Sequence, residues 1–205
     1  MGRPVLTDEQ IHAFRARATD AAMRLFVRDG YGGFSIRALA KELGCSHATP
    51  YRYFEGKDEL FAAVRAEGFR RFTAFLRARL EGVAEHDARL RALAHGYFDF
   101  ARREPEAFAI TFEMSQPSEG WAFVDEAAAE GWGVLHEVVG GAAAAGVLEG
   151  EVNTLAHTMW AGIHGVATLH VAGKLRMGRT GEEVVAHMID ALIRAHAPAG
   201  QETKR

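Results

Sequence analysis

Side chains that form hydrogen bonds or stack on rings are concentrated in one short stretch of the chain, between residues 46 and 57. Such groups bind the base edges and phosphate oxygens of nucleic acids, and a helix in the DNA major groove presents them on one face. We therefore expect a surface that binds double-stranded DNA. Its residues are Ser35, Arg37, Ser46, His47, Ala48, Thr49, Tyr51, Arg52, Tyr53 and Lys57.

The position of each side chain in this stretch suggests its role. A recognition helix points its N-terminal residues at the bases, whereas flanking polar groups hold the backbone. Base contacts are therefore expected from His47, Thr49 and Tyr51, and phosphate contacts from Ser35, Ser46, Tyr53 and Lys57, while Arg52 suits either role.

Two short helices must position these side chains. Ser35 is a favourable N-cap, and the apolar residues that follow it recur at the spacing of one helical face. Gly44 suits the left-handed end of that helix. Ser46 can cap a second helix, in which Pro50 lies within the first turn and costs at most one backbone hydrogen bond. This pattern predicts a helix-turn-helix.

The same stretch resembles the DNA-binding domain of the TetR family of transcriptional regulators. The residues that carry the resemblance are Ile36, Leu39, Ala40, Gly44, Ser46, Thr49, Tyr51, Tyr53, Phe54, Lys57 and Leu60. It implies a homodimer in which each subunit binds half of a pseudo-palindromic operator. Cys45 replaces the usual aliphatic turn residue, which we expect to be harmless. His47 and Pro50 stand where Lys and Leu are common, so the operator sequence does not follow from the resemblance.

Helical periodicity continues through the rest of the chain, and no strand-like alternation is present. Further helices are expected over 7–29, 58–82, 86–103, 105–114, 119–146, 151–175 and 182–196, with a loop at 31–34 and a break at Gln116-Pro117-Ser118. The predicted fold is all-α. It consists of a three-helix DNA-binding head (residues 1–56), a helical effector-binding and dimerisation domain (57–200) and a disordered tail (201–205).

A second resemblance lies in the last third of the chain. Trp160, His164 and Gly165, with Phe100, Pro105 and Phe108 upstream, resemble the WHG class of TetR C-terminal domains. This class implies a cavity for a mostly apolar small-molecule effector. Candidate lining residues are Tyr97, Phe98, Phe108, Phe112, Trp121, Trp132, Trp160 and His164, although each one taken alone is better explained as core.

His157, Trp160 and His164 share one helical face, which leaves three interpretations open. They can be structural, they can contact the effector, or they can bind a metal. The metal is least favoured, because zinc needs three or four ligands and the sequence nearby offers only two. No metal and no cofactor are therefore expected.

The last two predicted helices carry more apolar and small residues than one small bundle needs. We expect them to form a four-helix interface with a second copy of the chain. Its residues are Leu155, Met159, Ile163, Val185, Met188, Ile189 and Leu192.

The charge distribution supports a DNA-binding first part. Residues 1–80 hold 14 Lys and Arg against 9 Asp and Glu, a net of +5, whereas the remainder holds 10 against 18, a net of −8. A basic module beside an acidic one suits contact with phosphates at one end only. Ordinary variation in surface charge is the alternative.

Other functional classes find little support in the sequence. There is no Gly-x-Ser-x-Gly, phosphate-binding loop or His-Glu-x-x-His motif, so we do not expect an enzyme. A single cysteine and the lack of a signal-like or membrane-spanning apolar run favour a cytoplasmic protein without a membrane partner. The competing interpretation is a helical dimer that binds a small molecule but no operator.

Overall fold

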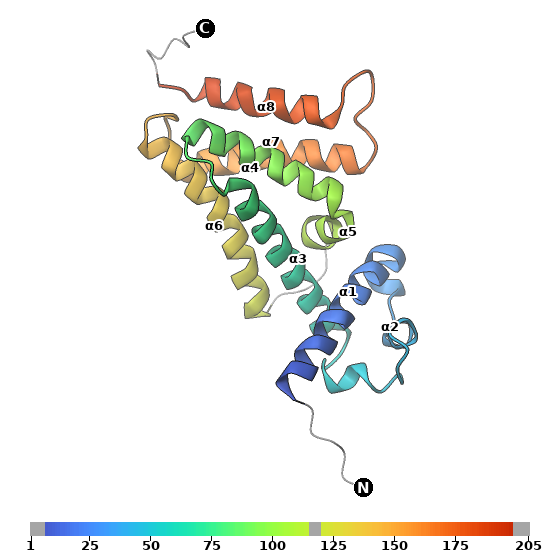
Figure 1. Cartoon of the computed structure of the whole chain (residues 1–205). Helices are drawn as coiled ribbons and strands as arrows, with labels where there is room; N and C mark the ends of the chain where they lie inside the picture. The colour runs from blue at the N-terminus through green and yellow to red at the C-terminus, as the bar shows by residue number, and fades with distance from the viewer. Residues whose placement is uncertain (1–6, 115–119, 199–205) are drawn as a thin grey trace. The chain divides into compact units, whose positions relative to one another are not determined.

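The computed structural model describes residues 7–114 and 120–198, and every regular element within them is helical (Figure 1). The elements are α1 (Asp8–Gly33), α2 (Ile36–Glu42), η1 (Pro50–Arg52), α3 (Lys57–Leu80), α4 (His86–Arg103), α5 (Pro105–Phe108), η2 (Ala109–Glu113), α6 (Ala122–Ala144), α7 (Val152–Val171) and α8 (Gly181–Ala195). The predicted all-α class is confirmed.

The chain packs into two compact units, and each combines two separate stretches of sequence. The first unit is Met1–Phe69 with Glu106–Ala128, and the second is Arg70–Pro105 with Ala129–Arg205. Helices α3 and α6 each contribute residues to both units. Packing therefore divides the chain differently from the expected boundary between residues 56 and 57, which stays a prediction.

The first unit has an aromatic core around Phe26 of α1. The ring of Phe26 stacks on Phe34 with 3.9 Å between centroids and meets the edge of Phe61 at 4.9 Å. All three side chains are buried. The contact between Phe26 and Phe34 was predicted, whereas Phe61 shows that the first turns of α3 complete this core.

A second cluster of the first unit joins α3 to α6. Ala62 and Ala66 of α3 are buried against Val124 and Ala127 of α6, with Phe69 packed alongside. Small residues on α3 allow the two helices to approach closely, and burial of the larger side chains provides the apolar contact.

The second unit is built on α4, α7 and α8, which lie side by side (Figure 1). Two glycines allow this packing. A Cβ atom on Gly162 of α7 would lie 2.9 Å from the sulfur of Met188, and one on Gly181 would lie 2.3 Å from the ring of Phe98. Both distances are too short for any other residue without a shift of its neighbours.

Three predicted helices differ in detail. Gly30, with φ of +69°, breaks α1 where a stop was expected, but residues 31–33 add a further turn in place of the expected loop. Residues 109–113 form a π-turn rather than a continuation of the helix at Pro105. Helix α7 ends at Val171, because Gly173 adopts a left-handed conformation two residues later.

The largest difference concerns the second helix of the helix-turn-helix. The expected α-helix after Ser46 is a turn followed by the single 3₁₀ turn η1. Pro50 supplies no N–H at the start of η1, and buried Phe54 ties down the chain shortly after its end. The expected break at 116–118 and the tail at 201–205 lie outside the described residues.

Two features are absent from the residues that the structure describes. No helix there is both long enough and apolar enough to cross a membrane. No three His, Cys, Asp or Glu side chains in the same part of the chain group as metal ligands would.

Candidate nucleic-acid interface

The ten side chains assigned to DNA contact are all at least partly accessible in the first unit. Seven are exposed, with Tyr51 at 57%, and Thr49, Tyr53 and Lys57 are half-buried. Their neighbours Pro50 and Phe54 are buried. The segment therefore presents polar groups outward and holds itself in place with apolar ones.

Local hydrogen bonds fix the turn that leads into this segment. The Ser35 hydroxyl accepts from the N–H of Ala38, which caps α2 as predicted. At the other end, Gly44 has φ of +66°, and the N–H of Cys45 donates to the carbonyl of Ala40. This pair of features is a Schellman ending, which redirects the chain after α2.

The segment from residue 46 to residue 54, which we call the recognition segment, is closed by its own side chains and by α1. The hydroxyls of Ser46 and Thr49 are 2.8 Å apart, and the Thr49 N–H donates to the Ser46 carbonyl. The Tyr53 ring stacks on Phe14 of α1 with 4.0 Å between centroids. Tyr53 thus divides its surface between α1 and solvent.

A single arginine links three elements of the head. The Arg15 guanidinium of α1 donates to the Tyr53 carbonyl, forms an ion pair with Glu59 of α3 at 3.0 Å, and lies over the Phe54 ring at 4.4 Å. Glu59 also accepts from the N–H of Glu55 at 2.6 Å. We call this set of contacts the Arg15 brace, and it holds the recognition segment between α1 and α3.

Lys57, the expected phosphate ligand, opens α3 beside an aromatic ring. Its ammonium lies 4.2 Å from the centroid of Tyr31, whose hydroxyl donates to Asp58. Burial, with a further contribution from Asp58, raises the pKa of Tyr31 to about 12. These contacts hold the Lys57 ammonium over the Tyr31 ring, while the side chain stays half-buried.

The second unit contains a hydrogen-bonded aromatic cluster. The indole N–H of Trp160 donates to the Tyr97 hydroxyl at 3.4 Å, and that hydroxyl is 2.9 Å from Nδ1 of His164. Burial raises the pKa of Tyr97, which keeps the phenol protonated as a donor. Since an indole can only donate, Tyr97 accepts from Trp160 and can donate onward to His164.

The packing divides the predicted effector residues between the two units. Tyr97, Trp160 and His164 form the cluster just described, and Trp132 joins it edge-on at 6.2 Å from Trp160. Phe98 is buried against His170 with 4.8 Å between centroids. Phe108, Phe112 and Trp121 belong to the first unit. All eight effector assignments stay predictions. The hydrogen bonds and ring contacts favour the cluster over the other four residues as a place for an effector.

Most of the predicted dimer residues point into their own chain. Leu155, Met159, Ile163, Val185 and Ile189 are each at most 2% exposed. Only Met188 and Leu192 are half-buried. The apolar side chains accessible on α7 are instead Trp160, Leu169 and Val171, with exposures of 36% to 44%. The periodic apolar face identified in the sequence packs α7 and α8 within one protomer.

Known families match both parts of the chain. The model described as bacterial regulatory proteins of the tetR family matches residues 18–64. The model described as tetracyclin repressor-like, C-terminal domain matches residues 90–192, half of the chain. The chain belongs to the TetR family. The description of the C-terminal model does not name the WHG class, so that part of the resemblance stays a prediction.

Sequence relatives of the chain include a transcriptional activator and a transcriptional repressor. The HTH-type transcriptional activator FasR of Mycolicibacterium smegmatis is 28% identical over 105 residues, which cover 51% of this chain and 48% of FasR. The nicotine-responsive transcriptional repressor HdnoR of Paenarthrobacter nicotinovorans is 33% identical over 85 residues, 42% of each protein. The chain thus matches about half the length of these relatives or less.

Solved structures match the TetR fold over most of the chain. A Rhodococcus sp. RHA1 protein of unknown function has a TM-score of 0.80 at 32% identity, covering 89% of this chain and 95% of that one. FadR of Bacillus subtilis, solved in complex with stearoyl-CoA, has a TM-score of 0.73 at 16% identity, with coverages of 87% and 97%. At that identity the likeness concerns the fold alone.

Two residues that position this TetR interface were missed by sequence reasoning. Arg15 lies 38 residues from Tyr53, and Glu59 lies four residues from Glu55, which directly follows the recognition segment. Both are in helices whose charged residues look like solvated faces. The sequence did hold a signal for the role of Arg15, because Arg15 directly follows the apolar Phe14, and both are half-buried in α1. Only the fold shows that these two residues meet Tyr53.

Proposed function

We propose that the chain is a homodimeric, ligand-responsive repressor that binds operator DNA through the first unit. The observation that carries the proposal is the recognition segment, whose polar side chains are exposed while Pro50 and Phe54 anchor it. Membership of the TetR family and a net charge of +5 over residues 1–80 support it. Repression follows by occlusion, since a bound dimer covers its operator.

Within this proposal, base reading is assigned to His47, Thr49 and Tyr51. Phosphate contacts are assigned to Ser35, Arg37, Ser46, Tyr53 and Lys57. Arg52 suits either role, and Ala48 is exposed next to His47. Phosphate contacts set affinity and its dependence on salt, whereas base contacts set sequence preference. The two groups therefore make separable contributions.

Selection of bound sequences from random DNA tests the proposal directly. The parent protein should enrich a pseudo-palindrome. Lys57→Ala should weaken binding about equally on all sequences and lower the salt slope by about one, whereas His47→Ala should change the preferred bases. Failure to enrich any sequence would refute operator binding and favour a helical, ligand-binding dimer.

The partner of α7 and α8 is proposed to be a second copy of the chain. Accessible apolar residues on these helices include Leu169 on α7 and Met188 and Leu192 on α8. An obligate interface buries about 2,000 Å² or more, which requires such apolar positions at its centre. Each recognition segment then takes one half-site, and two-fold symmetry explains the expected pseudo-palindrome.

The effector is proposed to bind at the cluster of Tyr97, Trp132, Trp160 and His164. Its aromatic walls favour a mostly apolar molecule, and its hydrogen-bonding groups provide orientation. The relative HdnoR is named as nicotine-responsive, which supports control by a small molecule. A hundredfold release from DNA requires about 3 kcal/mol of coupling between the two sites.

A further inference from the structure

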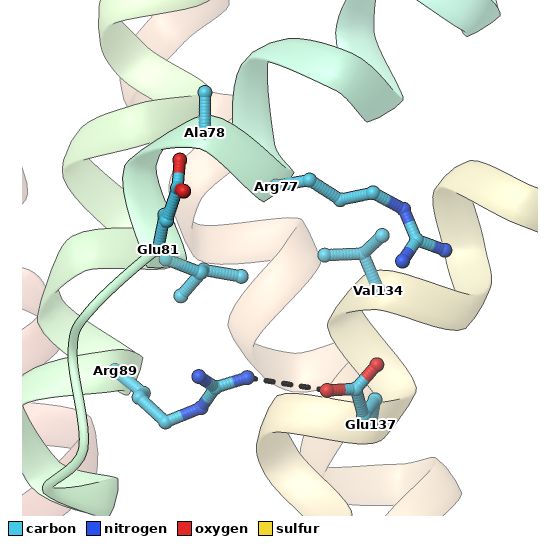
Figure 2. Close-up of a pocket in the computed structure, with 7 residues that line it drawn as sticks. Arg77, Ala78, Glu81, Arg89, Val134 and Glu137 are labelled. Carbon is cyan, nitrogen blue, oxygen red and sulfur yellow. Dashed lines mark hydrogen bonds and ion pairs between the residues drawn. The ribbon is translucent and has the colours of Figure 1, made fainter.

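The second unit contains a cavity that is separate from the aromatic cluster. Its volume is about 490 Å³, and its walls come from the end of α3, the first turns of α4 and the middle of α6 (Figure 2). This volume lies in the range of small-molecule sites, about 300–1,000 Å³. None of Tyr97, Trp132, Trp160 and His164 lines it.

One charged pair in this cavity is already satisfied by the protein. The Arg89 guanidinium forms an ion pair with Glu137 at 3.1 Å, drawn as a dashed line in Figure 2, and donates to the Val83 carbonyl at 3.2 Å. Arg89 is only 23% exposed, so these contacts hold it as part of the wall. Its charge is neutralised where it stands.

The two other charged residues of the cavity have no partner within the described part of the protein. Arg77 and Glu81, both on the cavity wall, have no hydrogen bond or ion pair from their side chains to any residue in the described part of the chain. They are four residues apart, yet their side chains extend in different directions (Figure 2). A cation and an anion thus line the same cavity without pairing to each other.

The signs of these charges determine what ligand fits. A purely anionic ligand that meets Arg77 would also meet Glu81 and Glu137, and a purely cationic one would meet two guanidinium groups. A ligand with one charge of each sign satisfies both free groups at zero net charge. Buried Leu80 and Val134 provide apolar backing between them.

We propose that this cavity binds a small zwitterion with an apolar body, through its carboxylate to Arg77 and its ammonium to Glu81. Because the Arg77 and Glu81 side chains extend in different directions (Figure 2), a ligand that meets both needs its charges separated by more than the single carbon of an α-amino acid. A dipeptide with free termini has this separation. The site is additional to the proposed effector site and does not rest on DNA binding.

Isothermal titration of the full chain with L-leucyl-L-leucine tests the proposal. The dipeptide should bind, and its N-acetylated and C-amidated analogues, each lacking one charge, should bind at least about tenfold more weakly. Arg77→Gln and Glu81→Gln should each weaken dipeptide binding by about the same factor. Both residues are exposed, so these variants should fold, which circular dichroism checks.

Two matched variants identify the site. Arg79→Gln changes a neighbouring arginine of α3 that pairs with Asp99 and does not line the cavity, so it should leave dipeptide binding unchanged. His164→Ala should also leave it unchanged, because His164 belongs to the aromatic cluster. No binding by the parent, equal binding of the singly charged analogues, or equal losses in Arg77→Gln and Arg79→Gln would each overturn the proposal.

Discussion

The Arg15 brace gives the sharpest test of how the head is held together. Replacement of Arg15 by Met keeps an apolar stem but removes the guanidinium, and with it the contacts to the Tyr53 carbonyl, Glu59 and the Phe54 ring. A hydrogen bond from a charged donor contributes about 1.5–3 kcal/mol, and the ring contact about 0.5–1 kcal/mol.

The expected net loss is smaller than the sum of these values. One guanidinium makes all the contacts, and the Arg15 side chain is 36% exposed, so solvent screens part of its interaction with Glu59. We therefore expect Arg15→Met to lower the free energy of opening of the recognition segment by about 2 kcal/mol. This corresponds to roughly thirtyfold faster amide exchange there.

Hydrogen exchange followed by mass spectrometry measures this effect on peptides that cover residues 46–56. Arg24→Met is the matched control, since Arg24 on the same helix pairs with Glu42 at 2.9 Å but is 58% exposed. Such a surface pair contributes at most about 1 kcal/mol, so its loss should change exchange by about fivefold or less. If Arg15→Met accelerates exchange no more than Arg24→Met does, the brace does not hold the segment.

Four further outcomes are expected. Met188→Glu with Leu192→Glu should give monomers in light scattering and lose operator binding, whereas Val27→Glu, a change at an exposed valine of α1, should leave the dimer intact. Trp160→Ala and His164→Ala should leave dimer and operator affinity near the parent values but raise the effector concentration needed for release from DNA. Damaged dimerisation with normal release would place both residues at the dimer interface instead. The pKa of Tyr31 lies above its ordinary value of 10, so the stabilising contribution of this group is complete below pH 10 and is lost as the pH rises toward 12. Ultraviolet titration should show that Asp58→Asn lowers the pKa of Tyr31. An unchanged pKa would exclude the Asp58 contact. Hydrogen bonds from Thr154 and Asn153 hold the pKa of Glu151 below its ordinary value of 4.5, so stability is lost as the pH falls through this lowered pKa. The melting temperature of Glu151→Gln should therefore fall less steeply with decreasing pH than that of the parent. Equal slopes would contradict the capping role of Glu151.

Much of the fold could be predicted from local signals in the sequence. Caps at Thr7 and Ser35 and the left-handed Gly44 are read from a few neighbouring residues, and each lies where it was expected. Helix α4 begins and ends at the expected residues, His86 and Arg103. Such features depend on backbone hydrogen bonds between near neighbours, so no knowledge of the tertiary structure is needed to place them.

Other features depend on contacts between distant residues. Apolar periodicity does not predict the π-turn at Ala109–Glu113 or the shortness of η1. The candidate dimer residues stay a prediction, since an apolar stripe on α7 fits a neighbour in the same chain as well as one in a partner. Ile163 and Ile189 are each 1% exposed, and the packing of α4, α7 and α8 on one another accounts for this burial.

The discontinuity of the first unit has a consequence for the order of synthesis. The ribosome releases the chain from its N-terminus, so Ala62 and Ala66 emerge well before Val124 and Ala127, the residues that cover them. Residues 70–105 are made in between and belong to the other unit. The first unit therefore cannot finish its core until about two thirds of the chain has been translated, and a nascent chain stalled earlier would expose an apolar face of α3 to chaperones.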